Sequence, residues 1–164
     1  MSKLTVELKK ELIKKAFSAQ KRAYTPYSGF QVGAALLTRD GKIYEGCNIE
    51  NASYGATNCA ERTAFFRAVY EGERDFLAIA IVGKPEKSEE YEYCAPCGIC
   101  RQVMAEFGVP EEFQIILPRS LEDYKEFTLE ELLPLSFTGD SMKSKTPQSA
   151  TGYQTYSAAE LRGI

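Results

Sequence analysis

The sequence predicts a layered α/β domain built on a mixed sheet of five strands. Three observations lead to this prediction. Segments with helical or strand periodicity follow one another in the order helix, strand, strand, helix, strand, helix, strand, strand, helix. The chain has 164 residues, which is about the size of one domain. The run 76–82 (FLAIAIV) is apolar throughout, which is typical of a central strand that is buried on both faces.

The expected elements follow from the spacing of apolar residues. The predicted helices span residues 5–24, 59–71 and 97–107, with a short fourth helix over 128–134. The predicted strands span residues 32–38, 43–48, 76–82, 113–117 and 124–127. Most aromatic side chains in these segments are expected in the core. They are Phe65, Phe66, Phe76, Phe107 and Phe113.

Turn and cap residues support these boundaries. Residues 25–26 (TP) end the first helix, since proline cannot continue it. Residues 40–41 (DG) are typical of the tight turn of a hairpin between the first two strands. Gly72 is a stop signal for the second helix. Thr128 and Glu131 have the spacing of a capping box that opens the last helix.

Composition and charge limit the function classes. The chain is 44% hydrophobic and 26% charged, with 20 basic and 23 acidic side chains and a formal net charge of −3. This balance argues against a dedicated nucleic-acid binder, which usually has a basic face. The longest apolar run is far shorter than the roughly 20 residues of a membrane helix, and early charges exclude a signal or transit peptide. We therefore expect a cytoplasmic protein with neither a nucleic-acid nor a membrane partner.

The chain divides into two parts by composition. Residues 1–137 contain all the predicted elements and form the expected domain. Residues 138–164 are rich in Ser, Thr, Gln, Gly and Pro, and their apolar residues are scattered. The second part is predicted to be a weakly ordered polar tail.

Histidine is absent, and five cysteines remain. Without histidine there is no Ser-His-Asp triad and no His-ligated metal. The odd number of cysteines and the expected intracellular context favour metal binding or catalysis over disulfides. Cys97 and Cys100 form a C-x-x-C motif, and Cys59 opens another predicted helix. Since helix N-termini favour thiolates, two such ends that meet would form a three-thiolate metal site.

Spacing alone leaves alternatives open. Cys94 adds a second C-x-x spacing, so the motif also resembles part of an iron–sulfur run, and a closed four-thiolate structural zinc site is conceivable. Glu61 follows Cys59 by two positions and could be a catalytic acid–base. It also lies three positions after Asn58, which is a capping-box spacing. However, a C-x-E motif followed by P-C-x-x-C is close to the signature of zinc deaminases.

Five segments together resemble the cytidine deaminases of the small, homotetrameric, three-cysteine class. The segments are residues 27–36 (YSGFQVGAAL), 46–52 (GCNIENA), 59–64 (CAERTA), 96–102 (PCGICRQ) and 132–137 (LLPLSF). They occur in the order typical of that family, and the resemblance covers about residues 5–137. It implies a three-layer α/β/α fold.

The resemblance also implies a role for individual residues. Cys59, Cys97 and Cys100 would bind one Zn²⁺ per subunit, and Glu61 would shuttle protons. Arg62 would donate hydrogen bonds to zinc-bound thiolates, where the alternative is a surface ion pair. The implied substrate-binding groups are Asn48 and Glu50 on the ribose, Phe30 on the nucleoside, the backbone of Ala60 and Cys97 on the base, and Tyr54 and Phe137 reaching sites in neighbouring subunits of a homotetramer.

The implied reaction is hydrolytic deamination in pyrimidine salvage. A water activated by zinc would attack C4 of the cytosine of cytidine or 2′-deoxycytidine, and ammonia would leave. Because the carboxylate of Glu50 would repel a phosphate, we expect free nucleosides to be substrates and oligonucleotides to be poor ones. The alternatives are a blasticidin S-type antibiotic deaminase, a polynucleotide deaminase, and a structural four-cysteine zinc module that needs Cys94 but not Glu61.

Overall fold

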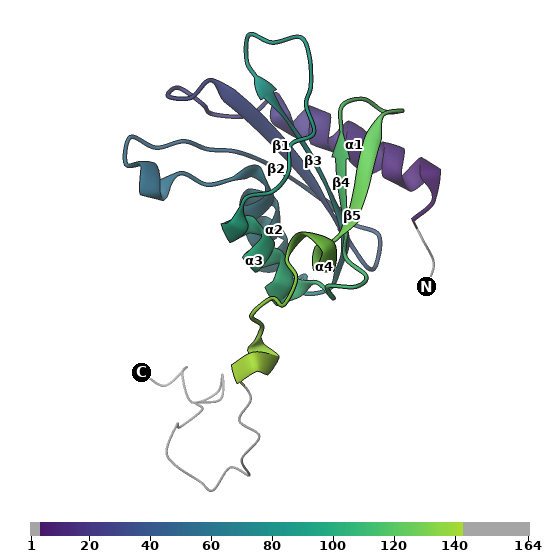
Figure 1. Ribbon diagram of the computed structural model, residues 1–164. Helices are drawn as coiled ribbons and strands as arrows, with labels where there is room; N and C mark the ends of the chain where they lie inside the picture. Colours follow the sequence, from purple (N-terminus) through teal and green to yellow (C-terminus); the bar gives the residue numbers. More distant parts are fainter. Residues whose placement is uncertain (1–3, 143–164) are drawn as a thin grey trace, which may run out of the picture.

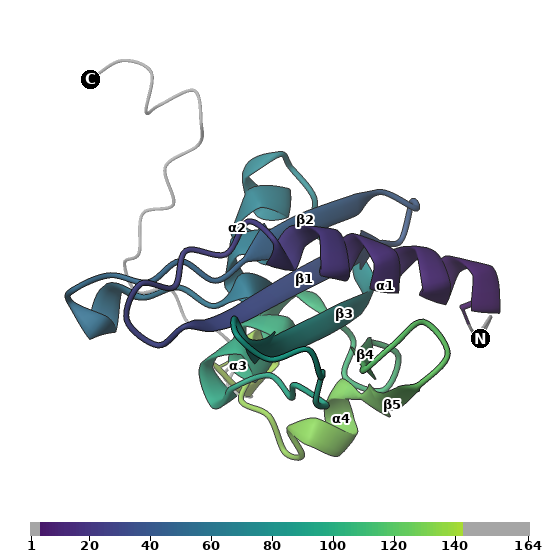
Figure 2. The same cartoon turned by 90° about the horizontal axis from the view of Figure 1, so that it is seen from above.

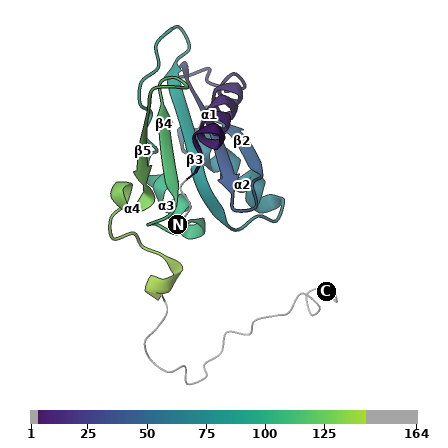
Figure 3. The same cartoon turned by 90° about the vertical axis from the view of Figure 1, so that its right-hand side faces the viewer.

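A computed structural model describes residues 4–142, and its centre is a mixed five-stranded sheet in the order β2-β1-β3-β4-β5. The strands are β1 (Phe30–Thr38), β2 (Ile43–Cys47), β3 (Phe76–Pro85), β4 (Gln114–Pro118) and β5 (Tyr124–Thr128). Only the β3–β4 pair is parallel; the other neighbouring pairs are antiparallel. Figure 3 shows β5, β4 and β3 side by side in this order. The predicted mixed five-stranded sheet is therefore confirmed.

Helices cover both faces of the sheet (Figures 1 and 2). The helices are α1 (Val6–Gln20), α2 (Ala60–Tyr70), α3 (Gly98–Phe107) and the short α4 (Leu129–Leu132). Single turns of 3₁₀ helix add Tyr54–Ala56 and Gly139–Met142. In the part of the chain that the structure describes, no helix combines the length and the apolar character needed to cross a membrane.

Strand alternation divides the core into two apolar layers. On one face, Leu12 and Ile13 of α1 pack with Ala35 and Leu37 of β1. On the other face, α2 and α3 pack against the alternate side chains of the same strands, with Phe65 at the centre. Successive side chains of a strand point to opposite faces, so β1 and β3 contribute to both layers. The predicted three-layer α/β/α arrangement is confirmed.

The end of the first helix and the place of Phe66 differ from the sequence-based expectation. The first helix ends at Gln20 instead of residue 24. Tyr24 instead pairs with Ile49, donating its backbone N–H to the Asn48 carbonyl and accepting a hydrogen bond from the Glu50 N–H. This long-range pairing takes the place of further helical turns. The prediction that Phe66 is in the core was wrong, because its side chain is on the outer face of α2 and is 50% exposed.

The expected polar tail lies mostly beyond the described residues. Residues 143–164 lie outside them. Within the described part, Gly139–Met142 form the 3₁₀ turn that follows α4. The short helix α4 begins with the predicted capping box, in which Thr128 and Glu131 exchange hydrogen bonds, and it ends at Leu132 instead of residue 134.

Candidate metal centre and active site

Three cysteine thiols meet where α2 and α3 begin. Cys59 and Cys97 are the N-cap residues of α2 and α3, and Cys100 lies in the first turn of α3. Their sulfur atoms lie within 4.8 Å of one another, and the Cys59 and Cys97 sulfurs are 3.9 Å apart. Among residues 4–142, this is the one group of three or more His, Cys, Asp or Glu side chains close enough to share a metal ion.

The spacing of the sulfurs fits zinc. Tetrahedral zinc holds thiolates at about 2.3 Å, which places two sulfurs on one ion about 3.8 Å apart. The pair formed by Cys59 and Cys97 already has nearly this separation. Cys97 is exposed, whereas Cys100 is buried. Three protein ligands with one exposed side are typical of a catalytic zinc site, which keeps a fourth position open.

A close approach of α2 to the sheet positions Cys59. A Cβ atom on Gly46 of β2 would lie 2.4 Å from both the Ala60 carbonyl oxygen and the Ala64 backbone nitrogen. Real Cβ atoms do not come so close to backbone atoms, so only glycine lets the helix lie directly on the strand at this point. The N-terminal turn of α2 therefore starts at a fixed height above β2, and Cys59 is held there.

Cys94 is not part of the cluster. Its sulfur packs against Gly83 of β3, near the ring of Phe30. Burial raises the pKa of the Cys94 thiol to about 12, so the group is a neutral thiol. The four-thiolate alternative with Cys94 as a ligand is therefore wrong for this geometry. Cys47 is also separate, and its thiol donates to the Arg22 carbonyl.

Charge in the cluster is concentrated on Cys59. A hydrogen bond from Cys100, assisted by Arg62 and Cys97, lowers the pKa of Cys59 to about 5. The same hydrogen bond to the Cys59 thiolate, together with burial, raises the pKa of Cys100. Cys59 thus accepts hydrogen bonds from its neighbours. A bound cation would replace these hydrogen bonds between thiols, because metal ligation deprotonates a coordinating thiol.

Arg62 lies behind the cluster. Its Nη2 donates to the Thr57 carbonyl at 3.3 Å and to Cys59 Sγ at 3.5 Å. Arg62 Nε is buried and has no hydrogen-bond partner among the described residues. Arg62 forms no ion pair with a carboxylate within residues 4–142, so the alternative of a surface pair is wrong.

Glu61 is buried beside the thiols, with 4% of its surface exposed. Burial raises the pKa of Glu61 to about 7, and its own backbone N–H and Cys100 act in the opposite direction as hydrogen-bond donors. The capping alternative is wrong, because α2 has no side-chain cap. Asn58 instead donates to the hydroxyl of Thr63 at 3.0 Å. A buried carboxyl of this kind can both accept and return a proton near neutral pH.

Asn48 and Glu50 are held in place by backbone groups. Asn48 continues the β1–β2 ladder through its side chain, which accepts from the Val32 N–H at 2.8 Å and donates to the Phe30 carbonyl at 2.8 Å. Glu50 accepts from the Tyr27 and Ser28 N–H groups at 2.9 and 3.2 Å and from the Ser28 hydroxyl. These bonds lower the pKa of Glu50, so its carboxylate is ionised.

The three predicted aromatic contacts lie at different places. Phe30 is partly exposed at the start of β1 and borders Gly83. Tyr54 is 73% exposed and makes an edge contact with Tyr27, with ring centroids 6.0 Å apart. Phe137 is 59% exposed and follows α4. Ala60, whose backbone is expected to contact the base, is the first residue of α2.

Two residues of the second cysteine motif have contacts that sequence reasoning missed. Arg101 donates to the Pro96 carbonyl at 2.9 Å and to the Leu132 carbonyl at 2.6 Å. Gln102 donates to the Phe137 carbonyl at 2.7 Å. Both side chains therefore tie the C-terminal segment to the helix that carries two of the thiols. The acceptors Leu132 and Phe137 lie 31 and 35 positions further along the chain, so no local pattern could have identified these two contacts.

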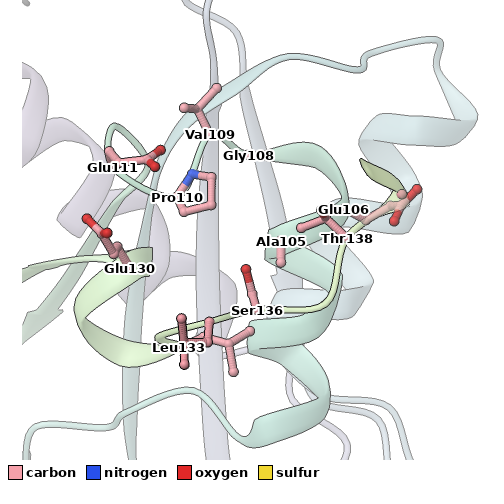
Figure 4. A pocket seen from close by; sticks show the side chains of 12 residues that line it. Ala105, Glu106, Gly108, Val109, Pro110, Glu111, Glu130, Leu133, Ser136 and Thr138 are labelled. Atoms are coloured by element: carbon pink, nitrogen blue, oxygen red, sulfur yellow. The ribbon is translucent and has the colours of Figure 1, made fainter. Parts of the chain in front are cut away.

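A separate cavity of about 790 Å³ lies between the end of α3, α4 and the segment 133–139. Figure 4 shows the side chains of Glu111, Glu130 and Leu133 around it. None of the predicted site residues lines this cavity. It brings no cysteine to its wall, so the candidate chemistry belongs to the cysteine cluster instead.

The fold and the site define a class of protein: an α/β/α domain with a three-thiolate zinc centre at two helix N-termini and a buried carboxyl beside it. Residues 6–115 match the family model described as the cytidine and deoxycytidylate deaminase zinc-binding region. The three cysteines of the cluster lie within this match. The chain therefore belongs to the cytidine deaminase family.

Individual relatives agree. The chain is 53% identical over 131 residues to a cytidine deaminase of Halalkalibacterium halodurans, covering 80% of this chain and 95% of the relative. It is 46% identical over 138 residues to a cytidine deaminase of Sporosarcina psychrophila, covering 84% and 97%. A crystal structure of cytidine deaminase from Burkholderia pseudomallei superposes with a TM-score of 0.70 at 49% identity, covering 77% and 97%.

Proposed function

We propose that this protein hydrolyses cytidine and 2′-deoxycytidine to uridine and 2′-deoxyuridine, with water consumed and ammonia released. The observation on which this proposal depends is the buried Glu61 carboxyl beside the three-cysteine cluster. The relatives named above are themselves cytidine deaminases. The reaction has a place in pyrimidine salvage.

A zinc ion held by Cys59, Cys97 and Cys100 would supply a Lewis acid and a water activated for attack near neutral pH. Three thiolates bring more negative charge than the ion can neutralise. The N-termini of α2 and α3 offset part of this charge through their helix dipoles. Arg62 offsets more by its hydrogen bond to Cys59.

Glu61 transfers the protons. Its carboxylate takes a proton from the attacking water and delivers it to N3 of the cytosine ring. It then takes the proton of the hydroxyl group that has been added to C4 and delivers it to the amine, which leaves as ammonia, so the same carboxyl acts first as base and later as acid. A positioned group of this kind contributes roughly 10²–10⁴-fold to a rate. Burial of Glu61 supports this role, because it excludes bulk water as a competing proton carrier.

Asn48 and Glu50 bind the ribose hydroxyls, Phe30 packs on the nucleoside, and the backbone of Ala60 and Cys97 contacts the base. The hydrogen bonds that hold Asn48 and Glu50 support this assignment, since preformed groups lose little freedom on binding. The ionised Glu50 disfavours a phosphate on the ribose. Free nucleosides are therefore the substrates, with no nucleic acid as partner.

The active unit is a homotetramer with shared sites, one zinc per subunit. Exposed aromatic residues support self-association: Tyr54, Phe66, Tyr70 and Phe137 each expose at least half of their surface. Cys97 of the cluster is also exposed, so the site gains a cover when a second subunit packs over it. Tyr54 and Phe137 provide that cover. Reduced thiols are needed for zinc, which favours the cytoplasm.

Ultraviolet assays with cytidine test the reaction, with zinc measured in each protein. We expect turnover by the parent and a loss of at least about 100-fold in Glu61→Gln with zinc retained. Glu71→Gln, in an exposed surface pair at the end of the same helix, is the matched control. A zinc-loaded parent that ignores cytidine would contradict the proposal and direct the search to a blasticidin S-type antibiotic.

Mixed oligomers test the shared sites. Glu61→Gln and Phe137→Ala subunits are each expected to be nearly inactive alone. When they are produced together, a site can combine an intact Glu61 with Phe137 of a neighbour, and activity should return. Sedimentation of the same samples gives the oligomeric state. No recovery in a verified mixed tetramer would mean that each site is complete within one subunit.

A further inference from the structure

We propose that Cys94 is a positioning residue for the nucleoside site: its sulfur occupies the space above Gly83 and holds the ring of Phe30 in place. This inference rests on the proposed function in one respect, which is that Phe30 contacts the nucleoside. It assigns a role to a cysteine that does not join the metal cluster.

The packing above Gly83 shows how close these groups are. A Cβ atom on Gly83 would lie 2.7 Å from Cys94 Sγ, 3.2 Å from Cys94 Cβ and 3.0 Å from Phe30 Cε1. The sulfur and the ring edge therefore share the space that a side chain at position 83 would fill. Gly83 does not have a positive φ, so glycine is needed here for space and not for backbone conformation.

Backbone pairing brings the three residues together. Phe30 and Val32 of β1 pair with Pro85 and Gly83 of β3. Glu92 returns to Gly83 through an isolated antiparallel bridge, so the segment before Cys97 is also fixed to β3 at this glycine. Cys94 lies between that bridge and the zinc ligand. The space above Gly83 thus lies between the strand that carries Phe30 and the loop that carries Cys97.

This space lies on the side of the sheet where the metal cluster is. Val32 and Cys94 both pack against the core layer that α2 and α3 cover. Phe30 shares the face of Val32, because residues two apart in a strand point the same way. A neutral, polarisable thiol packs well on an aromatic edge. Cys94 therefore limits the positions that the Phe30 ring can adopt, although it is not itself a metal ligand.

Kinetics and thermal stability of four proteins test this role: the parent, Cys94→Ala, Gly83→Ala and the double variant. Removal of the sulfur should let the ring of Phe30 move. We expect Cys94→Ala to raise KM for cytidine about 2- to 10-fold, with kcat and zinc content nearly unchanged. Val69→Ala, which truncates a partly buried side chain of the same core layer on α2, controls for general loosening and should leave KM unchanged.

The double variant gives the sharper result. Gly83→Ala alone forces a methyl group against the sulfur and the ring, so it should raise KM more than Cys94→Ala and lower the melting temperature. Removal of the sulfur eliminates the closest of these contacts, at 2.7 Å, so the double variant should recover part of both losses relative to Gly83→Ala.

Four outcomes would overturn the proposal. An active parent whose KM is unaffected by Cys94→Ala shows that the sulfur does not position the ring. A double variant no better than Gly83→Ala shows that the two residues do not share the space in the way described. A zinc-loaded parent without cytidine turnover overturns the proposed function, and this positioning role with it. A loss of zinc in Cys94→Ala would instead make Cys94 a ligand.

Discussion

Gln102 Nε2, in the second turn of α3, donates a hydrogen bond to the backbone carbonyl of Phe137 at 2.7 Å. This contact joins the helix that carries Cys97 and Cys100 to the residue proposed to cover a neighbouring site. The position of Phe137 therefore depends on a side chain that takes no part in metal binding.

Gln102→Ala should weaken nucleoside binding without removing zinc. The loss of one neutral hydrogen bond costs about 1 kcal/mol, so kcat/KM for cytidine should fall about fivefold. The assay is steady-state kinetics with zinc measured in parallel. Glu106→Ala, one turn further along α3, is the control and should match the parent. Equal losses in both variants would show a general effect on the helix.

Arg62→Gln should weaken zinc binding. Arg62 donates to Cys59 Sγ at 3.5 Å and balances negative charge in the cluster. Loss of such a supporting contact typically costs 10–100-fold in metal affinity or activity, so we expect about that change in the zinc dissociation constant. Competition with a chelator gives the value. Arg67→Gln on the exposed face of α2 is the control, and a similar effect there would remove the special role of Arg62.

Cys100→Ser should abolish stoichiometric zinc binding, because Cys100 is the buried member of the cluster. The melting temperature of the protein prepared with zinc should fall as well, since bound metal stabilises the folded state. Cys47→Ser should keep one zinc per chain, as the Cys47 thiol faces the Arg22 carbonyl. Metal analysis of both purified variants decides, and zinc retained in Cys100→Ser would exclude the three-thiolate site.

Gly46→Ala should separate α2 from β2. The added methyl would meet backbone atoms of Ala60 and Ala64 at 2.4 Å, and backbone cannot move aside as a flexible side chain can. We expect a loss of at least about 1–3 kcal/mol in the free energy of unfolding and weaker zinc binding. Denaturant unfolding measures the first. Gly139→Ala, where a Cβ meets nothing within 4 Å, should change neither property.

Glu50→Gln should relax the discrimination against phosphate. The carboxylate of Glu50 is ionised and fixed by Tyr27 and Ser28. Its removal should lower kcat/KM for cytidine. It should also reduce the ratio of kcat/KM for cytidine to kcat/KM for cytidine 3′-phosphate. The two substrates are compared in parallel, with Glu45→Gln on β2 as control. An unchanged ratio would assign the discrimination to another residue.

The core pattern and most element boundaries could be predicted because they depend on local features. The apolar run at β3, the capping box at Thr128 and the stop at Gly72 are short-range signals. The end of α1 was mispredicted, since Tyr24 is drawn into pairing with Ile49, 25 positions away in the chain. Phe66 was misplaced because periodicity alone did not show which side of α2 faces the sheet.

The residues of the site could be named from the sequence, but their competing roles could not be separated there. Glu61 had the spacing of a cap and of a catalyst, and the fold excludes the cap, because Glu61 is buried beside the thiols and α2 has no side-chain capping bond. Cys94 had the spacing of a fourth ligand, and the fold turned it toward Gly83. Both outcomes depend on contacts between residues that are far apart in the sequence, and the spacing of residues within a motif does not show such contacts.

By itself, the sequence determined the order of the elements, the three candidate thiols and the acidic residue beside them, because each is written in local pattern and residue type. Only the tertiary structure decided which thiols meet, how Arg62 reaches Cys59, and that Gln102 holds Phe137. The physical reason is that these contacts arise where helices pack on a sheet, and the missing side chains of Gly46 and Gly83 set how closely the elements approach.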